Sequence, residues 1–299
     1  GSTGKVITVA AAMEEGLITP ESVFTIPYSM KVSDGVFRDH EKHPTQRLTT
    51  TGLLAVSSNT GSIQIGQKLG KDNLYKYLTK FGIGQSTNSK LPGESAGILH
   101  PVKDWSGTSL PTISFGQGYS LTAMQSTSVF ATIANNGVRV KPSILAGVVD
   151  ESGKYTPSAA NESTRVLSEQ TAINMRAMME NVVSKNGTAP SAAIDGYRVA
   201  GKTGTAQRYN TACRCYSGYT ASFIGFAPAD QPKYVVSVTI QDPKGMHWGG
   251  VLAGPVFKKV MGFVLQNQRI SPTPETKTFY SLTEAALKQR SKITPKSGA

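Results

Sequence analysis

The chain is poor in the residues that most metal sites and many catalytic sites use. Its 299 residues include four histidines, two cysteines and two tryptophans, and 19 acidic residues stand against 31 lysines and arginines. Two cysteines are too few for a zinc cage, which takes four ligands. No run approaches the roughly 20 apolar residues of a membrane span, and we find no secretory signal. Serine and lysine are therefore the first residues to consider as catalytic groups.

The basic excess, a net charge of +12, raises the question of a nucleic-acid partner. The lysines and arginines are scattered, however, and do not alternate with aromatic side chains that could stack on bases. We therefore expect no nucleic acid and favour an anionic cell envelope as the environment. With 38% hydrophobic residues, the chain can bury the core of one two-lobed domain.

Three short motifs follow one another along the chain. They are Ser2-Thr3-Gly4-Lys5, Ser57-Ser58-Asn59 and Lys202-Thr203-Gly204-Thr205. A serine hydroxyl is a weak nucleophile and needs a neighbouring base, and a lysine three residues further along a helix lies on the same face. The motifs together indicate a serine acyl-transfer site that uses lysine as its base.

The local sequence around the first motif predicts a helix. Residues 3–15 form a largely apolar run that ends at Gly16, and Ser2 stands directly before it. We expect Ser2 to be the N-cap, where the positive end of the helix dipole favours developing negative charge.

The other two motifs are expected at a helix junction and on a strand. Apolar residues flank Ser57-Ser58-Asn59 on both sides, which predicts two inward-packed helices interrupted by polar side chains. Lys202-Thr203-Gly204-Thr205 precedes two strand candidates, residues 219–226 and 234–240. On an edge strand this motif would present an ammonium group, a hydroxyl and an approachable backbone, which suits carboxylate recognition.

The motif set, in this order, is known from penicillin-binding proteins and class A β-lactamases. The chain resembles the transpeptidase domain of class B penicillin-binding proteins of the division-associated type. Further matches lie in segments 91–97, 114–118, 196–201, 223–228 and 249–257.

The resemblance implies a mixed α/β (α+β) fold, in which helices flank an antiparallel sheet and a helical lobe completes the active site. We expect this transpeptidase domain to span residues 1–268. Residues 269–299 would form a polar, partly ordered extension with a short helix near residues 282–287.

The resemblance also implies a reaction. Ser2 would attack the carbonyl between two D-alanines at the end of a peptidoglycan stem peptide, with Lys5 as its base. Ser57 would relay a proton, Asn59 would hold the substrate amide, and the N–H groups of Ser2 and Thr205 would form the oxyanion hole. Lys5 would need a lowered pKa, and burial, the helix N-terminus and Lys202 would lower it.

Substrate binding would fall to the remaining motif residues. An amine of a neighbouring stem would resolve the ester, and β-lactam antibiotics would imitate the D-Ala-D-Ala unit. No cofactor and no metal are implied. The residues expected to bind the substrate or a β-lactam are Ser58, Lys202, Thr203, Gly204 and Thr205.

Class B proteins also carry a membrane anchor and a pedestal before the catalytic domain. This chain opens one residue before Ser2, so we expect a preceding segment, including strands of the sheet, to be missing from it. The resemblance implies a single-pass protein whose catalytic domain lies outside the membrane and takes part in septal wall synthesis. A membrane glycan polymerase and other divisome proteins would be its partners.

Two alternatives stay open. The first is a related serine hydrolase, a β-lactamase or carboxypeptidase, in which water resolves the acyl-enzyme. In class A β-lactamases a glutamate for that step lies between the second and third motifs. Here Glu94 lies in that interval, but it belongs to segment 91–97 and we interpret it as structural. The second alternative is a β-lactam-sensing receptor domain, against which segments 91–97 and 114–118 argue.

The chain also contains a pair of nearby cysteines and a pair of nearby histidines. Cys213 and Cys215 are expected to be free thiols in a loop, since a bridge across two residues strains the usual Cα separation of about 4.4 to 6.8 Å, although a location outside the cytoplasm would permit a disulfide. His40 and His43 lie beside acidic residues at metal-like spacing. Because residues 32–44 look like a polar loop, we expect these charged side chains to be solvated rather than to bind metal.

Overall fold

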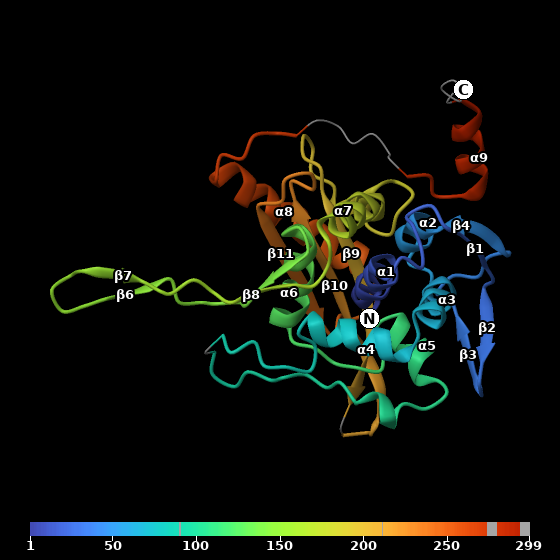
Figure 1. The fold of residues 1–299 in the computed structure, drawn as a ribbon, viewed down its shortest axis with the longest axis horizontal. Helices are drawn as coiled ribbons and strands as arrows, with labels where there is room; N and C mark the ends of the chain where they lie inside the picture. The colour runs from blue at the N-terminus through green and yellow to red at the C-terminus, as the bar shows by residue number, and fades with distance from the viewer. Residues whose placement is uncertain (90, 211, 274–279, 294–299) are drawn as a thin grey trace.

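An antiparallel sheet of three strands forms the centre of the computed structural model, which describes residues 1–89, 91–210, 212–273 and 280–293. The sheet order is β11-β10-β9 (Figure 1). Both predicted strands are confirmed, and among the described strands the one with the lysine motif lies at an edge. The strands are β9 (Ala200–Asn210), β10 (Cys215–Ala227) and β11 (Tyr234–Gln241).

Helices cover both faces of this sheet (Figure 1). Helix α8 (Gly249–Asn267) packs on one face, where the rings of Phe257 and Phe223 lie 4.7 Å apart. Helices α6 (Ala123–Ala134) and α7 (Glu169–Val183) pack on the other face. Successive residues of a strand point to opposite faces, so β10 supplies side chains to both cores. No described helix is both long and apolar enough to cross a membrane.

A helical lobe lies beside the sheet, as expected. Its helix α1 is buried from Lys5 to Met13, because small and apolar residues occupy every side of it. It packs against the other helices of the lobe and against α7. The lobe comprises α1 (Lys5–Glu14), α2 (Thr50–Ala55), α3 (Asn59–Leu69), α4 (Lys71–Lys80) and α5 (Ser109–Ser114).

Four short antiparallel pairs of the described strands lie outside the central sheet. The β6–β7 hairpin extends far from it, on the left of Figure 1. Two 3-10 turns, η2 (Val102–Asp104) and η3 (Pro190–Ala192), complete the connections. The pairs are β1 (Val23–Ile26) with β4 (Gln46–Thr49), β2 (Ser29–Val32) with β3 (Gly35–Arg38), β5 (Val138–Val140) with β8 (Ser163–Arg165), and β6 (Gly147–Val149) with β7 (Tyr155–Pro157).

The C-terminal segment folds back on the helical lobe. Thr49 N donates to Leu282 O at 3.1 Å, and Arg47 forms an ion pair with Glu284 at 3.0 Å. The helix predicted near residues 282–287 is present but begins and ends later, as α9 (Glu284–Ile293). Residues 274–279 and 294–299 of the predicted extension lie outside the described residues.

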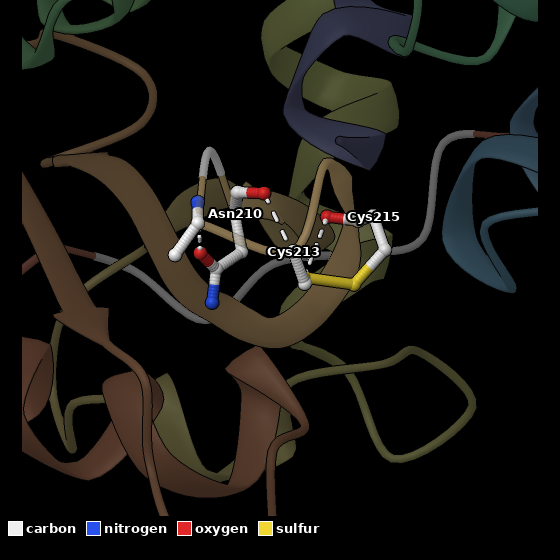
Figure 2. Close-up of a disulfide and its surroundings, with 4 residues drawn as sticks. Asn210, Cys213 and Cys215 are labelled. Atoms are coloured by element: carbon white, nitrogen blue, oxygen red, sulfur yellow. Dashed lines mark hydrogen bonds between the residues drawn. A yellow bond between two sulfur atoms is a disulfide. The ribbon is translucent and has the colours of Figure 1, made fainter.

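The expectation of two free thiols is wrong. Cys213 and Cys215 form a disulfide at the turn between β9 and β10 (Figure 2). Arg214 between them adopts a left-handed conformation, φ 50°, which folds the backbone back on itself. The two Cα atoms therefore lie 5.2 Å apart, within the separation that a disulfide tolerates.

Close backbone packing seats the start of α8 on the sheet. A Cβ at Gly249 would lie 2.2 Å from the carbonyl oxygen of Ser222 and 2.3 Å from that of Gly204. We therefore expect Gly249→Ala to lower the free energy of unfolding by about 1–3 kcal/mol, as over-packing does. In the same helix a Cβ at Gly262 meets nothing within 4 Å. Gly262→Ala should raise the stability by about 1 kcal/mol, the helix-propensity difference.

Urea unfolding of both variants measures these changes. Equal effects of the two substitutions would contradict the close approach of α8 to β9 and β10.

Candidate active site

Ser2 lies in a 3-10 turn, η1 (Ser2–Gly4), that leads directly into α1. The expectation that it is the N-cap of a helix over residues 3–15 is wrong. Gly1 precedes η1 and Gly4 precedes α1, and neither end carries a side-chain cap. Gly4 N instead bonds to Gly1 O at 2.9 Å, which closes the turn around Ser2. Tertiary packing sets this tighter start.

The turn is clamped between strand β9 and the segment around Gly116. A Cβ on Gly1 would lie 3.1 Å from the Ala206 Cβ, so the turn lies directly against the lysine-motif strand. On the other side, Gly116 has φ +94°, and a Cβ there would lie 1.9 Å from Gly1 O. Only glycine permits this conformation and this approach. Segment 114–118 thus fixes the position of the turn that carries Ser2.

Lys5, one turn after Ser2, is completely buried. Its Nζ donates to Ser57 O at 2.5 Å, to Asn59 Oδ1 at 2.7 Å and to Ser57 Oγ at 3.2 Å. Burial lowers its pKa to about 7, although the negative charge of Asp39 acts in the opposite direction. Near neutral pH a large fraction of this amine is thus uncharged and able to accept a proton.

Ser57 occupies a strained junction between α2 and α3. Its φ is +61°, a left-handed conformation that costs a non-glycine residue energy and is often found at functional sites. The adjacent Ser58 caps α3, accepting from Gly61 N at 2.9 Å. The two-helix junction predicted for this motif is confirmed, and it directs Ser57 toward both lysines.

Lys202 enters from β9 and is also completely buried. Its Nζ donates to Ser57 Oγ at 2.8 Å and lies 3.3 Å from Thr203 Oγ1. Burial and repulsion from Lys5 hold its pKa well below the ordinary value. Since a single hydroxyl lies between the two amines, Ser57 provides a short path for a proton between them.

A cavity of about 450 Å³ opens above this cluster. Five predicted site residues line it, namely Ser2, Ser57, Asn59, Thr203 and Thr205. Ser2 Oγ makes no hydrogen bond to the residues that the structure describes and so remains available to an incoming group. The other four predicted residues, Lys5, Ser58, Lys202 and Gly204, lie behind the lining. Lys202 therefore reaches Ser57 rather than presenting its ammonium at the cavity wall.

The sequence interpretation missed Asp39. It lies in the segment expected to be a solvated loop, yet it is only 8% exposed and accepts hydrogen bonds from Ser58 Oγ and Asn59 N. The expectation of a solvated side chain is therefore wrong for Asp39, because the β2–β3 hairpin places it at the start of α3. No group of three or more potential metal ligands occurs among the described residues. His40 and Trp248 also line the cavity, with rings 5.3 Å apart.

The family model for the penicillin-binding protein transpeptidase domain matches residues 1–262. The chain belongs to this family. It is 40% identical over 285 residues to the penicillin-binding protein PbpB of Mycolicibacterium smegmatis, covering 92% of this chain and 44% of that protein. It is 35% identical over 274 residues to the peptidoglycan D,D-transpeptidase FtsI of Escherichia coli, covering 91% of this chain and 44% of that protein.

Solved structures agree in fold. Penicillin-binding protein 3 from Mycobacterium tuberculosis, complexed with ampicillin, superposes with a TM-score of 0.90 at 36% identity. That match covers 95% of this chain and 65% of the other. The mixed α/β architecture expected from the sequence is therefore confirmed as the penicillin-binding transpeptidase fold. The chain spans less than half the length of the two relatives named above.

The buried amines give a direct spectroscopic prediction. In protein labelled with ¹³C at the lysine Cε position, the Lys5 signal should titrate at about pH 7, and the Lys202 signal should also titrate well below the ordinary value. The signals of solvent-exposed lysines in the same sample act as internal controls. Assignment uses Lys5→Arg and Lys202→Arg. Titration of Lys5 and Lys202 at the ordinary lysine value of about 10.4 would contradict the burial of this cluster.

Proposed function

We propose that the chain is the catalytic domain of a peptidoglycan D,D-transpeptidase that works through an acyl-enzyme on Ser2. The observation that carries this proposal is the placement of Ser2 on the cavity wall, one turn before a buried lysine whose pKa is about 7. A lysine in this state serves as a general base at neutral pH, which free lysine does not. The names of relatives, among them peptidoglycan D,D-transpeptidase, support the same reaction.

The first half-reaction forms an ester. Ser2 Oγ attacks the carbonyl carbon between the two terminal D-alanines, and the hydroxyl proton passes to neutral Lys5 Nζ. The tetrahedral intermediate collapses as the C–N bond breaks, and a proton returns to the leaving amine. Ser57 supports this relay because its hydroxyl contacts both lysine amines. Free D-alanine leaves, and the rest of the stem peptide stays on Ser2.

The second half-reaction consumes the ester. The amine of a neighbouring stem attacks the acyl carbon, loses a proton through the same relay and regenerates the Ser2 hydroxyl. The product is a new amide cross-link, and no external oxidant, metal or cofactor enters the balance.

The cavity wall supplies groups suited to the peptide. Asn59 would hold the substrate amide, and Thr203 and Thr205 would bind the terminal carboxylate with their hydroxyls. The N–H groups of Ser2 and Thr205 would form the oxyanion hole, in which one donor contributes about 3 kcal/mol in a comparable enzyme. The charge of Lys202 would act on the carboxylate from behind Thr203, and Ser58 and Gly204 would shape the wall from behind.

β-Lactams should react at the same serine, because they present a strained amide in place of the D-Ala-D-Ala bond. The family description names penicillin binding, and solved structures of a relative are complexes with ampicillin and aztreonam. We therefore propose that this chain forms a covalent penicilloyl ester.

The cellular setting is proposed on the same basis. Names such as PbpB, FtsI and stage V sporulation protein D support a role in wall synthesis during division. We propose a single membrane anchor before the domain, catalysis outside the membrane, and a glycan polymerase and other divisome proteins as partners. Strand β11 has one neighbour, β10, among the described strands, so its outer edge is suited to strands from a preceding segment.

Labelling tests the proposed site. Penicillin should add once to the protein, with the preceding segment supplied, and peptide mapping should place the adduct on Ser2. Ser2→Ala should abolish the adduct while leaving the unfolding transition in place. An adduct on Ser57 or Ser58 would contradict the assignment of the nucleophile.

The fate of the ester separates the transferase from a hydrolase. Glu94 bonds to Thr87 N at 2.6 Å within its own loop and does not line the cavity, in keeping with a structural role. Glu41 does border the cavity, but its side chain is 84% exposed. We expect a long-lived adduct and no appreciable turnover of a chromogenic cephalosporin. Turnover that Glu41→Gln abolishes would instead assign a β-lactamase with Glu41 as its base.

A further inference from the structure

A buried carboxylate stands directly behind the Ser57-Ser58-Asn59 turn. Asp39 follows strand β3 and is only 8% exposed, a burial that carboxyl groups show almost only when they are paired. Its Oδ1 accepts from Asn59 N at 2.5 Å and from Thr60 N at 3.0 Å. Its Oδ2 accepts from Ser58 Oγ at 2.8 Å. Three successive residues are thus tied to one carboxyl group.

These bonds fall at the N-terminus of α3. The first N–H groups of a helix have no partner within it, and the positive end of the dipole favours an anion there. Ser58 caps the same end through Gly61 N, so Asp39 completes the cap from a different part of the chain. The junction that places Ser57 in its left-handed conformation is therefore held by a charged anchor.

The anchor reaches the catalytic lysine through Asn59. The Asn59 Oδ1 accepts from Lys5 Nζ at 2.7 Å, and its Nδ2 donates to Arg38 O at 2.8 Å. Both ends of the amide are occupied, so its orientation is fixed by the Lys5 amine at one end and by the backbone carbonyl directly before Asp39 at the other. A shift of Asp39 would move the groups that hold the Lys5 amine.

The charge of Asp39 acts on the same amine. The titratable groups that face Asp39 are Lys5 from α1 and His40 and His43 from its own segment, and Lys5 in turn repels Lys202. His43 Nε2 lies 3.1 Å from Asp39 Oδ2 and its Nδ1 lies 2.7 Å from Pro44 O. Asp39 is the carboxylate whose field opposes the effect of burial on the pKa of Lys5.

We propose that Asp39 is a positioning residue of the acyl-transfer reaction, which anchors the Ser57-Ser58-Asn59 turn and stabilises the protonated Lys5 amine after it has taken the Ser2 proton. This inference rests on the proposed function. Asp39 touches no substrate and acts through Asn59, Ser58 and its charge. It adds a fourth segment, the β2–β3 hairpin, to the three that carry the motifs.

Asp39→Asn tests the anchor and its charge together. The amide keeps the size of the side chain but loses the charge and one acceptor oxygen. A misplacement of the reacting groups by about 1 Å costs about 100-fold in rate. We therefore expect penicillin to acylate Ser2 about 100 times more slowly. The Lys5 ¹³Cε titration should move to lower pH, because the opposing negative charge is gone. Asp34→Asn, an exposed carboxylate on the same hairpin, should match the wild type in both measurements.

Asp39→Glu keeps the inference testable if the asparagine variant does not fold. It retains the charge but displaces the carboxylate by one methylene, so acylation should slow while the Lys5 titration stays near the wild-type value. Wild-type acylation in either Asp39 variant, or an unmoved Lys5 titration in Asp39→Asn, would overturn the inference. Absence of labelling in the wild type itself would instead refute the proposed function.

Discussion

The site depends on two lysine amines that are removed from water and meet at one serine hydroxyl. Taking an ammonium group out of water costs several kcal/mol even after the protein relaxes. Burial is therefore tolerated only when the amines find acceptors and lose part of their charge. Lys5 and Lys202 satisfy both conditions, since each contacts Ser57 Oγ and each has a lowered pKa. The burial that makes the cluster costly also lowers the pKa of Lys5 to about 7, which the proposed base requires.

Because of this constraint, three separate segments must place their side chains within hydrogen-bond distance of one another. Helix α1 brings Lys5, the α2–α3 junction brings Ser57, and β9 brings Lys202. Gly116 allows the turn that carries Ser2 to lie against neighbouring backbone, and Gly249 allows the same for the start of α8. The left-handed Ser57 stores strain at the meeting point, which the well-packed helices on either side maintain.

The sequence predicted which residues lie together better than it predicted their local geometry. The motif set predicted that Ser2, Lys5, Ser57 and Lys202 would share one site, and the two strand candidates located β10 and β11. The start of α1 could not be predicted, because contacts with β9 and Gly116, far along the chain, turn Ser2 into a 3-10 residue rather than an N-cap.

Other differences have the same origin. Nothing local distinguishes Asp39 from its solvated neighbours, since its partners at the start of α3 lie 20 residues away in the sequence. The disulfide depended on the left-handed conformation of Arg214, which its sequence does not favour. Lys202 was expected to present its ammonium group to a carboxylate, whereas its amine donates to Ser57 Oγ, a contact that only the fold creates.

The most direct test of this account is the pH dependence of the rate at which penicillin acylates Ser2. If neutral Lys5 takes the Ser2 proton, the rate should rise with pH, level off above the pKa of about 7, and fall by about 10²–10⁴-fold in Lys5→Ala. A rate that does not change between pH 5 and 9, or one that Lys5→Ala leaves intact, would contradict the assignment of Lys5 as the base.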